Sequence, residues 1–210
     1  MNDIIVVTGT DNGVGKTWVA CALSVSLRER HNEVRAVKLV EIGAPTEASP
    51  DEDGALLARA AGQDAPTAAL RRFRAALAPA AAAESEGESI DLDRMLQEVR
   101  QVAAHADVLL IEGTGGLLAP ITWDCTVVDV ARRLGAHAVV VAADRAGTIN
   151  HTLLTLRALA EANVNCLGVA LNSVGATDAS TGTNAAALRR LAPGTRVVET
   201  DKTGWEQRLV

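Results

Sequence analysis

The residues best suited to chemistry lie in a glycine-rich stretch near the N-terminus. The stretch ends in a run that combines glycine, lysine and threonine: Asn12, Gly13, Val14, Gly15, Lys16 and Thr17. Gly13 and Gly15 can adopt a positive φ, which lets backbone N–H groups turn towards an anion. The compact ammonium of Lys16 suits β- and γ-phosphates, and the hydroxyl of Thr17 suits Mg²⁺. These six residues therefore predict a site for the phosphates of a nucleotide.

The elements around this stretch favour the same interpretation. An apolar run, Ile4 to Val7, precedes it and predicts a strand, while a helical pattern opens at Thr17. A helix N-terminus adds partial positive charge at the phosphates. The loop is one residue longer than the common G-x-x-x-x-G-K-[ST] form, because its first glycine is Gly9. The competing interpretation is an ordinary helix N-cap turn that contains glycine and lysine.

A second stretch could hold a metal ion. Four aliphatic residues, 108–111, have no polar alternation and predict a strand that is buried on both faces. Glu112 and a glycine-rich turn follow them directly. The carboxyl ends of parallel strands are where α/β sheets place ligand-binding groups. Glu112 is therefore expected to face the phosphates and to bind Mg²⁺ directly or through water; the alternative is a solvated strand end.

Strand and helix patterns alternate along the whole chain. Strands are predicted at 4–7, 34–40, 108–111, 138–142, 164–171 and 196–199, and helices at 18–30, 53–61, 89–104, 126–134, 150–162 and 183–191. The alanine-rich segment 68–83 is expected to be helix, a break at Pro79, and then surface chain, with its arginines on a solvated helix face. Alternation of this kind predicts a doubly wound α/β fold, with a mainly parallel sheet and helices on both faces. One nucleotide-binding domain is expected over residues 1–210.

Composition excludes several classes of partner. The formal net charge of −6 leaves no basic face for nucleic acid or for an acidic membrane surface. The three cysteines, Cys21, Cys125 and Cys166, are widely spaced and form no ligand pattern. They are typical of reduced thiols, and no targeting or membrane-spanning pattern is present. A cytoplasmic location is expected.

The motifs together resemble one family. In order along the chain they are Gly9-Thr10-Asp11, Val14-Gly15-Lys16-Thr17, Lys38, Asp53, Glu112 to Gly116, and Gly147 to His151. Their order and intervals are similar to those of dethiobiotin synthetases, which have a P-loop NTPase-like fold. Members join CO₂ to 7,8-diaminononanoate in biotin biosynthesis: an amine carbamate attacks the γ-phosphate of ATP, and the second amine displaces phosphate to close a ureido ring.

The resemblance implies a role for each matching residue. Lys16 and Lys38 would be catalytic, with Lys38 between carbamate and γ-phosphate. Thr17, Asp53 and Glu112 would bind Mg²⁺, with ATP as co-substrate, and Asn172 would recognise adenine. The substrate-binding set would be Lys38, Gly115, Gly147, Thr148, Ile149 and Asn150, with the last four acting across a homodimer interface. Asp53 and Asn150 could instead be simple helix N-caps.

Two departures from the family keep alternatives open. The family loop usually reads Lys-Pro-Val-x-Ser-Gly, but here Ile42 replaces the serine and Glu41 adds a carboxylate that is expected to stand beside the pocket. The segment after the last strand also lacks a proline-containing adenine loop. A nucleotide-binding paralogue with an altered substrate therefore stays open. So does a P-loop switch ATPase of the partitioning type, although Thr10 and Asp11 occupy the place of the second lysine that such proteins carry.

Overall fold

Six parallel strands form the central sheet of the computed structural model, which describes residues 3–210. They are β1 (Asp3–Gly9), β2 (Val34–Lys38), β5 (Val108–Gly116), β8 (His137–Ala143), β9 (Cys166–Asn172) and β10 (Val197–Glu199). Their order across the sheet is β10-β9-β8-β1-β5-β2, and every pair of neighbours is parallel. The predicted parallel sheet is confirmed.

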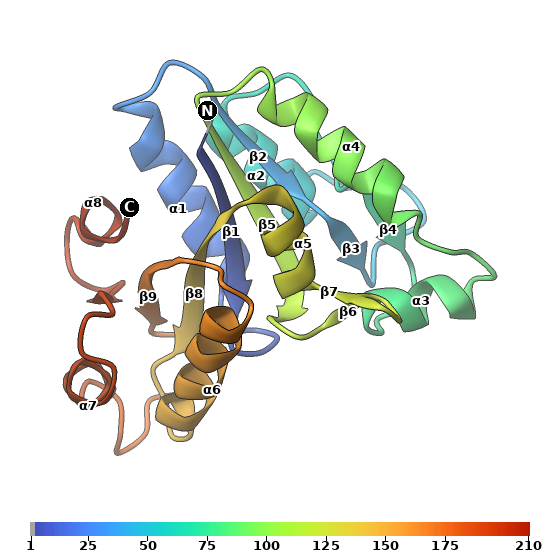
Figure 1. The fold of residues 1–210 in the computed structure, drawn as a ribbon. Coiled ribbons are helices and arrows are strands. Elements are labelled where there is room, and N and C mark those ends of the chain that lie inside the picture. The colour runs from blue at the N-terminus through green and yellow to red at the C-terminus, as the bar shows by residue number, and fades with distance from the viewer. Residues whose placement is uncertain (1–2) are drawn as a thin grey trace.

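Helices cover both faces of this sheet (Figure 1). One face carries α1 (Lys16–Arg28), α2 (Asp53–Ala61) and α8 (Trp205–Leu209); the other carries α4 (Leu92–Ala103), α5 (Val127–Leu134), α6 (Thr148–Glu161) and α7 (Asn184–Leu191). Successive strand residues point to opposite faces, so Val6 joins one core and Val7 the other. This is why the central strands are apolar without alternation.

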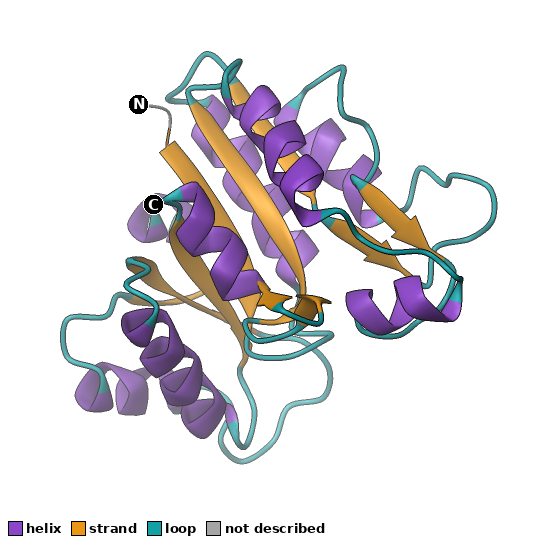
Figure 2. Ribbon diagram, turned by 45° about the vertical axis from the view of Figure 1, so that its right-hand side comes forward, coloured by secondary structure: helices purple, strands orange, loops and turns teal. Residues whose placement is uncertain are grey.

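The segment 68–83 differs from its prediction. Arg71–Phe73 forms the strand β4, which pairs with β3 (Val40–Ile42), and α3 (Pro79–Ser85) begins at Pro79 instead of breaking there. Figure 2 shows α3 beside this small sheet. The arginines do not lie on a solvated helix face: Arg71 pairs with Glu98 at 2.8 Å and Arg72 with Glu52 at 2.6 Å. Strand pairing and these distant carboxylates override the helical propensity of alanine.

The alternative that Asp53 and Asn150 are helix N-caps is wrong. The N-cap of α6 is Gly147, with φ of 87°, so the helix starts two residues before Asn150. The N-cap of α2 is Glu52, and Asp53 is the first helical residue. The N-cap of α4 is Asp91, whose side chain accepts a hydrogen bond from the backbone N–H of Arg94.

Three further short elements were not predicted. They are β6 (Pro120–Thr122), β7 (Cys125–Thr126) and α8. The first two form an antiparallel pair after β5. Among the helices of residues 3–210, none has the length and apolar content needed to cross a membrane.

Candidate active site

The loop between β1 and α1 is shaped by Gly15 at the helix N-terminus. Gly15 has φ of 87°, and a Cβ built on it would overlap the side-chain amide of Asn172. Only glycine fits here, because both the backbone conformation and the available space exclude a side chain. Lys16 is 7% exposed, and its Nζ donates to the carbonyl oxygen of Asp11 at 2.9 Å. Burial, with a smaller contribution from the charge of Lys38, lowers the pKa of Lys16 to about 8.

Strand pairing brings the second lysine to this loop. In the parallel register of β2 and β5, Lys38 lies opposite Glu112. Its Nζ donates to Glu112 Oε1 at 2.7 Å and to Asp53 Oδ2 at 2.8 Å. Because an ammonium has three N–H donors, one is left for another acceptor. The structure thus joins residues from β2, α2 and β5 in one ion-pair cluster.

The pKa values in this cluster reflect burial and charge pairing. Burial by itself lowers the pKa of Lys38, but the Glu112 and Asp53 carboxylates outweigh it and leave the pKa above its usual value. Burial raises the pKa of Glu112, and the Lys38 ammonium offsets part of that rise. For Asp53, burial opposes the shift, but Lys38 lowers the pKa overall.

One oxygen of Glu112 has no protein partner. Thr17 Oγ1 donates to Glu112 Oε1 at 2.9 Å. Glu112 Oε2 is buried and has no hydrogen-bond partner among the residues that the structure describes. An unpartnered buried carboxylate oxygen is costly and points to a ligand. Hydroxyl and carboxylate oxygens are the donors that Mg²⁺ prefers.

No group of three or more His, Cys, Asp or Glu in residues 3–210 forms a metal site by itself. Mg²⁺ does not need such a group, since it usually binds through one or two carboxylates together with phosphate oxygens and water. The oxygens of Thr17, Asp53 and Glu112 fit that pattern.

These groups border one cavity of about 320 Å³. It is lined by Asn12, Gly13, Gly15, Lys16, Thr17, Lys38, Ile42, Asp53, Glu112, Thr114 and Gly115. Its polar end is the lysine and carboxylate cluster, and its apolar wall includes Ile42. The predicted phosphate, metal and lysine positions are therefore neighbours in space.

Glu41 does not line this cavity, although its carboxylate lies next to Asp53, which does. Its carboxylate accepts from the backbone N–H of Asp53 at 3.1 Å and of Gly54 at 3.2 Å. It thereby caps the N-terminus of α2, where a negative charge is favourable. Burial, together with the nearby charge of Asp53, raises the pKa of Glu41.

A second cavity, of about 430 Å³, shares Gly15 with the first. It is lined by Gly15, Trp18, Asn172, Ser173, Val174, Thr200 and Asp201. Asn172 is predicted to read adenine, and its amide already has two partners. Its Nδ2 donates to the carbonyl oxygen of Val14 at 3.0 Å, and its Oδ1 accepts from Thr200 at 2.8 Å. The sequence pattern did not predict Trp18 and Thr200 as residues of this cavity. For Trp18, its position directly after the loop threonine Thr17 could have indicated that it lies near the site.

The predicted residues of α6 do not line the cavity beside the glycine loop. Gly147, Thr148, Ile149 and Asn150 form the start of α6. The middle of α6 instead borders a groove of about 290 Å³, lined by Thr10, Gly116, Leu117, Leu118, Ala119, His151, Leu154, Thr155 and Ala158. Leu118 and Leu154 are 62% and 55% exposed there.

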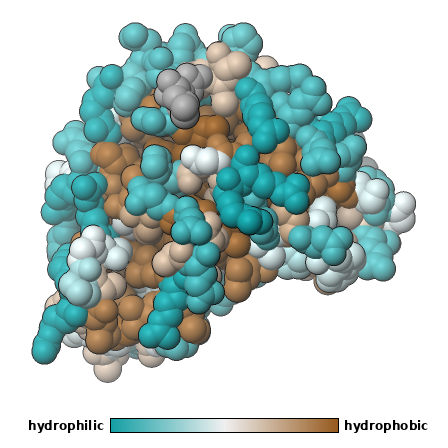
Figure 3. Space-filling model, in the orientation of Figure 1, coloured by the Kyte–Doolittle hydropathy of each residue, from teal (hydrophilic) through white to brown (hydrophobic). Residues whose placement is uncertain are grey.

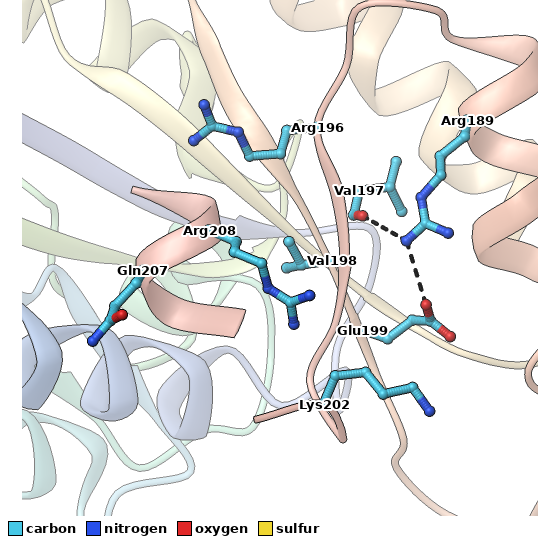
Figure 4. A pocket seen from close by; sticks show the side chains of 8 residues that line it. All are labelled: Arg189, Arg196, Val197, Val198, Glu199, Lys202, Gln207 and Arg208. Atoms are coloured by element: carbon cyan, nitrogen blue, oxygen red, sulfur yellow. Dashed lines mark hydrogen bonds and ion pairs between the residues drawn. The ribbon is translucent and has the colours of Figure 1, made fainter. Parts of the chain in front are cut away.

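A basic cavity of about 360 Å³ lies at the edge strand β10 (Figure 4). Arg189 donates to the carbonyl oxygen of Val197 at 2.9 Å and approaches Glu199 at 3.3 Å, while Arg196 and Arg208 bond backbone carbonyls. Two strands, β9 and β8, separate β10 from β1. Its cations therefore do not belong to the phosphate site.

Comparison with known proteins gives two kinds of match. A family model described as an AAA domain matches residues 3–198. The chain is 40% identical over 190 residues to an ATP-dependent dethiobiotin synthetase of Anaeromyxobacter dehalogenans (strain 2CP-C), covering 89% of this chain and 84% of that protein. It is 39% identical over 193 residues to an ATP-dependent dethiobiotin synthetase of Mycobacterium leprae (strain Br4923), with 90% and 84% covered.

Solved structures share the fold at low identity. The septum site-determining protein MinD from Pyrococcus horikoshii OT3, complexed with Mg-ADP, has a TM-score of 0.57 and 20% identity, covering 100% of this chain and 87% of that one. A plasmid partition protein from Borrelia burgdorferi has a TM-score of 0.58 and 11% identity, covering 99% and 95%. These similarities show a P-loop NTPase-like fold and no more.

Proposed function

This chain belongs to the ATP-dependent dethiobiotin synthetase family, and from that premise we propose how its cavity works. The chain is an ATP-dependent ligase that closes the ureido ring of dethiobiotin from 7,8-diaminononanoate and CO₂. The observation that carries the residue assignment is the convergence of Lys16, Lys38, Asp53 and Glu112 on one cavity beside the glycine loop. Likeness to the partition ATPases extends to the fold alone, so it does not favour the switch ATPase alternative.

Each step of the reaction needs charge to be held in place. One amine of the diamine adds to CO₂, loses a proton and becomes a carbamate. A carbamate oxygen attacks the γ-phosphorus while the bond to ADP breaks, which gives a mixed carbamic–phosphoric anhydride. The second amine then attacks the carbonyl carbon, phosphate leaves, and a proton is lost as the ring closes. Phosphoryl transfer of this kind depends on positioning and on preorganised charge.

The residues of the cavity supply that charge. Residues 12–17 would hold the triphosphate, with Lys16 at its β- and γ-phosphates. Lys38 is fixed by two carboxylates and keeps one N–H for the oxygens that pass between carbamate and phosphate. Because its pKa is raised, Lys38 stays protonated at neutral pH. Its charge is therefore in place before the transfer begins.

The same cavity fits Mg²⁺. The residues that would hold it are Thr17, Asp53 and Glu112, and the buried Glu112 Oε2 without a partner supports this assignment. When bound with ATP, the ion neutralises phosphate charge. Removing Mg²⁺ with EDTA is expected to abolish phosphate release.

The diamine would contact both copies of a homodimer. Lys38 and Gly115 line the cavity, but Gly147, Thr148, Ile149 and Asn150 do not, so these four would serve a neighbouring copy. Hydrophobic residues are visible between polar ones on the face that carries α5 and α6 (Figure 3). The exposed Leu118 and Leu154 of the α6 groove fit such an interface. Light scattering of the parent and of Leu154→Glu tests this, with a monomeric variant expected.

We also propose that residues 1–210 form one domain and that the protein is cytoplasmic. Helices from both halves of the chain pack on the same sheet, which supports the single domain. Cys21, Cys125 and Cys166 are all free thiols, as a reducing compartment favours.

The deciding experiment is release of phosphate from Mg-ATP and bicarbonate, with and without 7,8-diaminononanoate, together with mass detection of the cyclic urea. Diamine-dependent release with urea formation is expected. Slow release that ignores the diamine would favour the paralogue with an altered substrate. Lys16→Ala should lose Mg-ATP binding, and Glu112→Gln should keep the fold but lower turnover sharply. If either variant behaved like the parent, its assigned role would be wrong.

A further inference from the structure

We propose that the base of the bound nucleotide stacks on Trp18, which Trp205 supports from behind, and that this chain selects its nucleotide by the face of the base more than by its edge. The proposal rests on the nucleotide site of the proposed function. It adds a residue that the phosphate and metal assignments do not involve.

The position of Trp18 follows from the loop. It stands two residues after Lys16 on the first turn of α1, and it lines the cavity that shares Gly15 with the phosphate cavity. A nucleotide whose phosphates lie over residues 12–17 would direct its ribose and base into this neighbouring cavity. Trp18 is 53% exposed, although Val19 and Ala20, which follow it in the helix, are buried. A large aromatic surface is thus available where the base would arrive.

Trp205 makes this surface rigid. Its ring stacks on that of Trp18, with centroids 5.9 Å apart and an interplanar angle of 22°. Trp205 is only 3% exposed and begins α8, which packs against α1. Offset aromatic stacking holds Trp18 before any ligand arrives, so less side-chain entropy is lost on binding. The pair forms a platform with one ring in the core and one facing the cavity.

Part of the hydrogen-bonding capacity around the cavity is already used inside the protein. Asn172 uses one N–H for Val14 and one oxygen lone pair for Thr200, and its side chain is almost fully buried. These bonds join the glycine loop to the ends of β9 and β10. One N–H and one lone pair remain on Asn172, and the exposed Ser173 and Asp201 add a hydroxyl and a carboxylate. Among the described residues that line this cavity, Trp18 alone offers an aromatic face.

Calorimetry with two ligands separates the base from the phosphates. Mg-ADP carries both, whereas tripolyphosphate carries phosphates alone. Trp18→Ala is expected to weaken Mg-ADP about tenfold, within the range found for loss of base stacking, and to leave tripolyphosphate affinity unchanged. Trp18→Phe should recover most of the ADP affinity, because it keeps an aromatic face. Trp123→Ala is the matched control, since Trp123 is 66% exposed and lies outside both cavities.

Base selectivity gives a second readout. The parent should bind ADP more tightly than CDP, because a purine offers the larger face, and Trp18→Ala should remove most of that difference. Unchanged ADP affinity in Trp18→Ala would overturn the proposal. An equal loss of ADP and tripolyphosphate affinity would also overturn it, because Trp18 would then only support the loop. A parent that binds ADP but forms no urea would refute the ligase and leave this inference intact.

Discussion

Replacing Lys38 by methionine tests whether the buried cluster is held by charge. The side chains of Lys38 and Glu112 are 5% and 1% exposed, so solvent screens their attraction very little. Methionine keeps the apolar stem but removes the ammonium. It leaves the carboxylate of Glu112 buried without a cation, and breaking a buried pair in this way costs about 3–5 kcal/mol. With a urea m-value of about 2–3 kcal/mol/M, the unfolding midpoint should fall by about 1–2.5 M.

The pH dependence of this loss has a definite sign. Without Lys38, burial should hold the folded-state pKa of Glu112 further above its unfolded value of about 4.3. A carboxyl group with a raised pKa binds its proton more tightly in the folded state. The deficit of Lys38→Met relative to the parent should therefore be small near pH 4 and grow as the pH rises through the folded pKa.

A double variant separates stability from catalysis. In Lys38→Met/Glu112→Gln no charge remains at the most buried position, and Asp53 is 34% exposed and can be hydrated. The free energy of unfolding should return to within about 1–2 kcal/mol of the parent, while turnover stays lost because the ammonium is absent. A single variant that costs under about 1 kcal/mol, or a double variant no more stable than the single one, would refute the reasoning.

Three further predictions concern the elements around the cavity. Gly15→Ala should abolish Mg-ADP binding in calorimetry, because the new Cβ would overlap Asn172. The control Gly13→Ala has φ of 67° but open space around it, so it should lose far less Mg-ADP affinity. Equal losses of affinity in the two variants would argue against the overlap. Because the pKa of Lys16 is about 8, Mg-ADP affinity should fall as pH rises from about 7.5 to 9.5 while its amine loses the proton; a flat profile would contradict this. Glu41→Ala removes two capping hydrogen bonds from α2 and should lower the free energy of unfolding in urea by about 1–2 kcal/mol. A loss near zero would mean that this cap does not stabilise the protein.

Local spacing was enough to predict the glycine loop and the parallel sheet. Residues 12–17 are consecutive, so their spacing alone identifies the loop. The buried strands are recognisable as apolar runs, because both of their faces pack against a core. The ion pair between Lys38 and Glu112 could not be predicted from local spacing. These residues are 74 positions apart, and only the register of β2 against β5 brings them together. The sequence predicts that Lys38 and Glu112 each lie near the phosphates, but it does not predict the ion pair between them.

The errors have the same physical origin. Alanine favours helix in isolation, yet Arg71–Phe73 is a strand because β3 offers it a partner. The sequence pattern predicts a helix from Asn150, but Gly147 takes the positive φ that begins the helix earlier. In both places a contact or conformation outside the local pattern decided the outcome.

The tertiary structure gives different surroundings to Glu41 and Ile42, the two departures from the family loop. Glu41 and Ile42 are adjacent in β3, and neighbouring residues in a strand point to opposite sides. Glu41 therefore turns to the N-terminus of α2, where its charge is useful, while Ile42 turns to the phosphate cavity. The Glu41 carboxylate thus accepts the capping hydrogen bonds of α2. Ile42 is therefore the departure that changes the wall of the cavity, whereas Glu41 lies outside the lining and interacts with Lys38 through its charge.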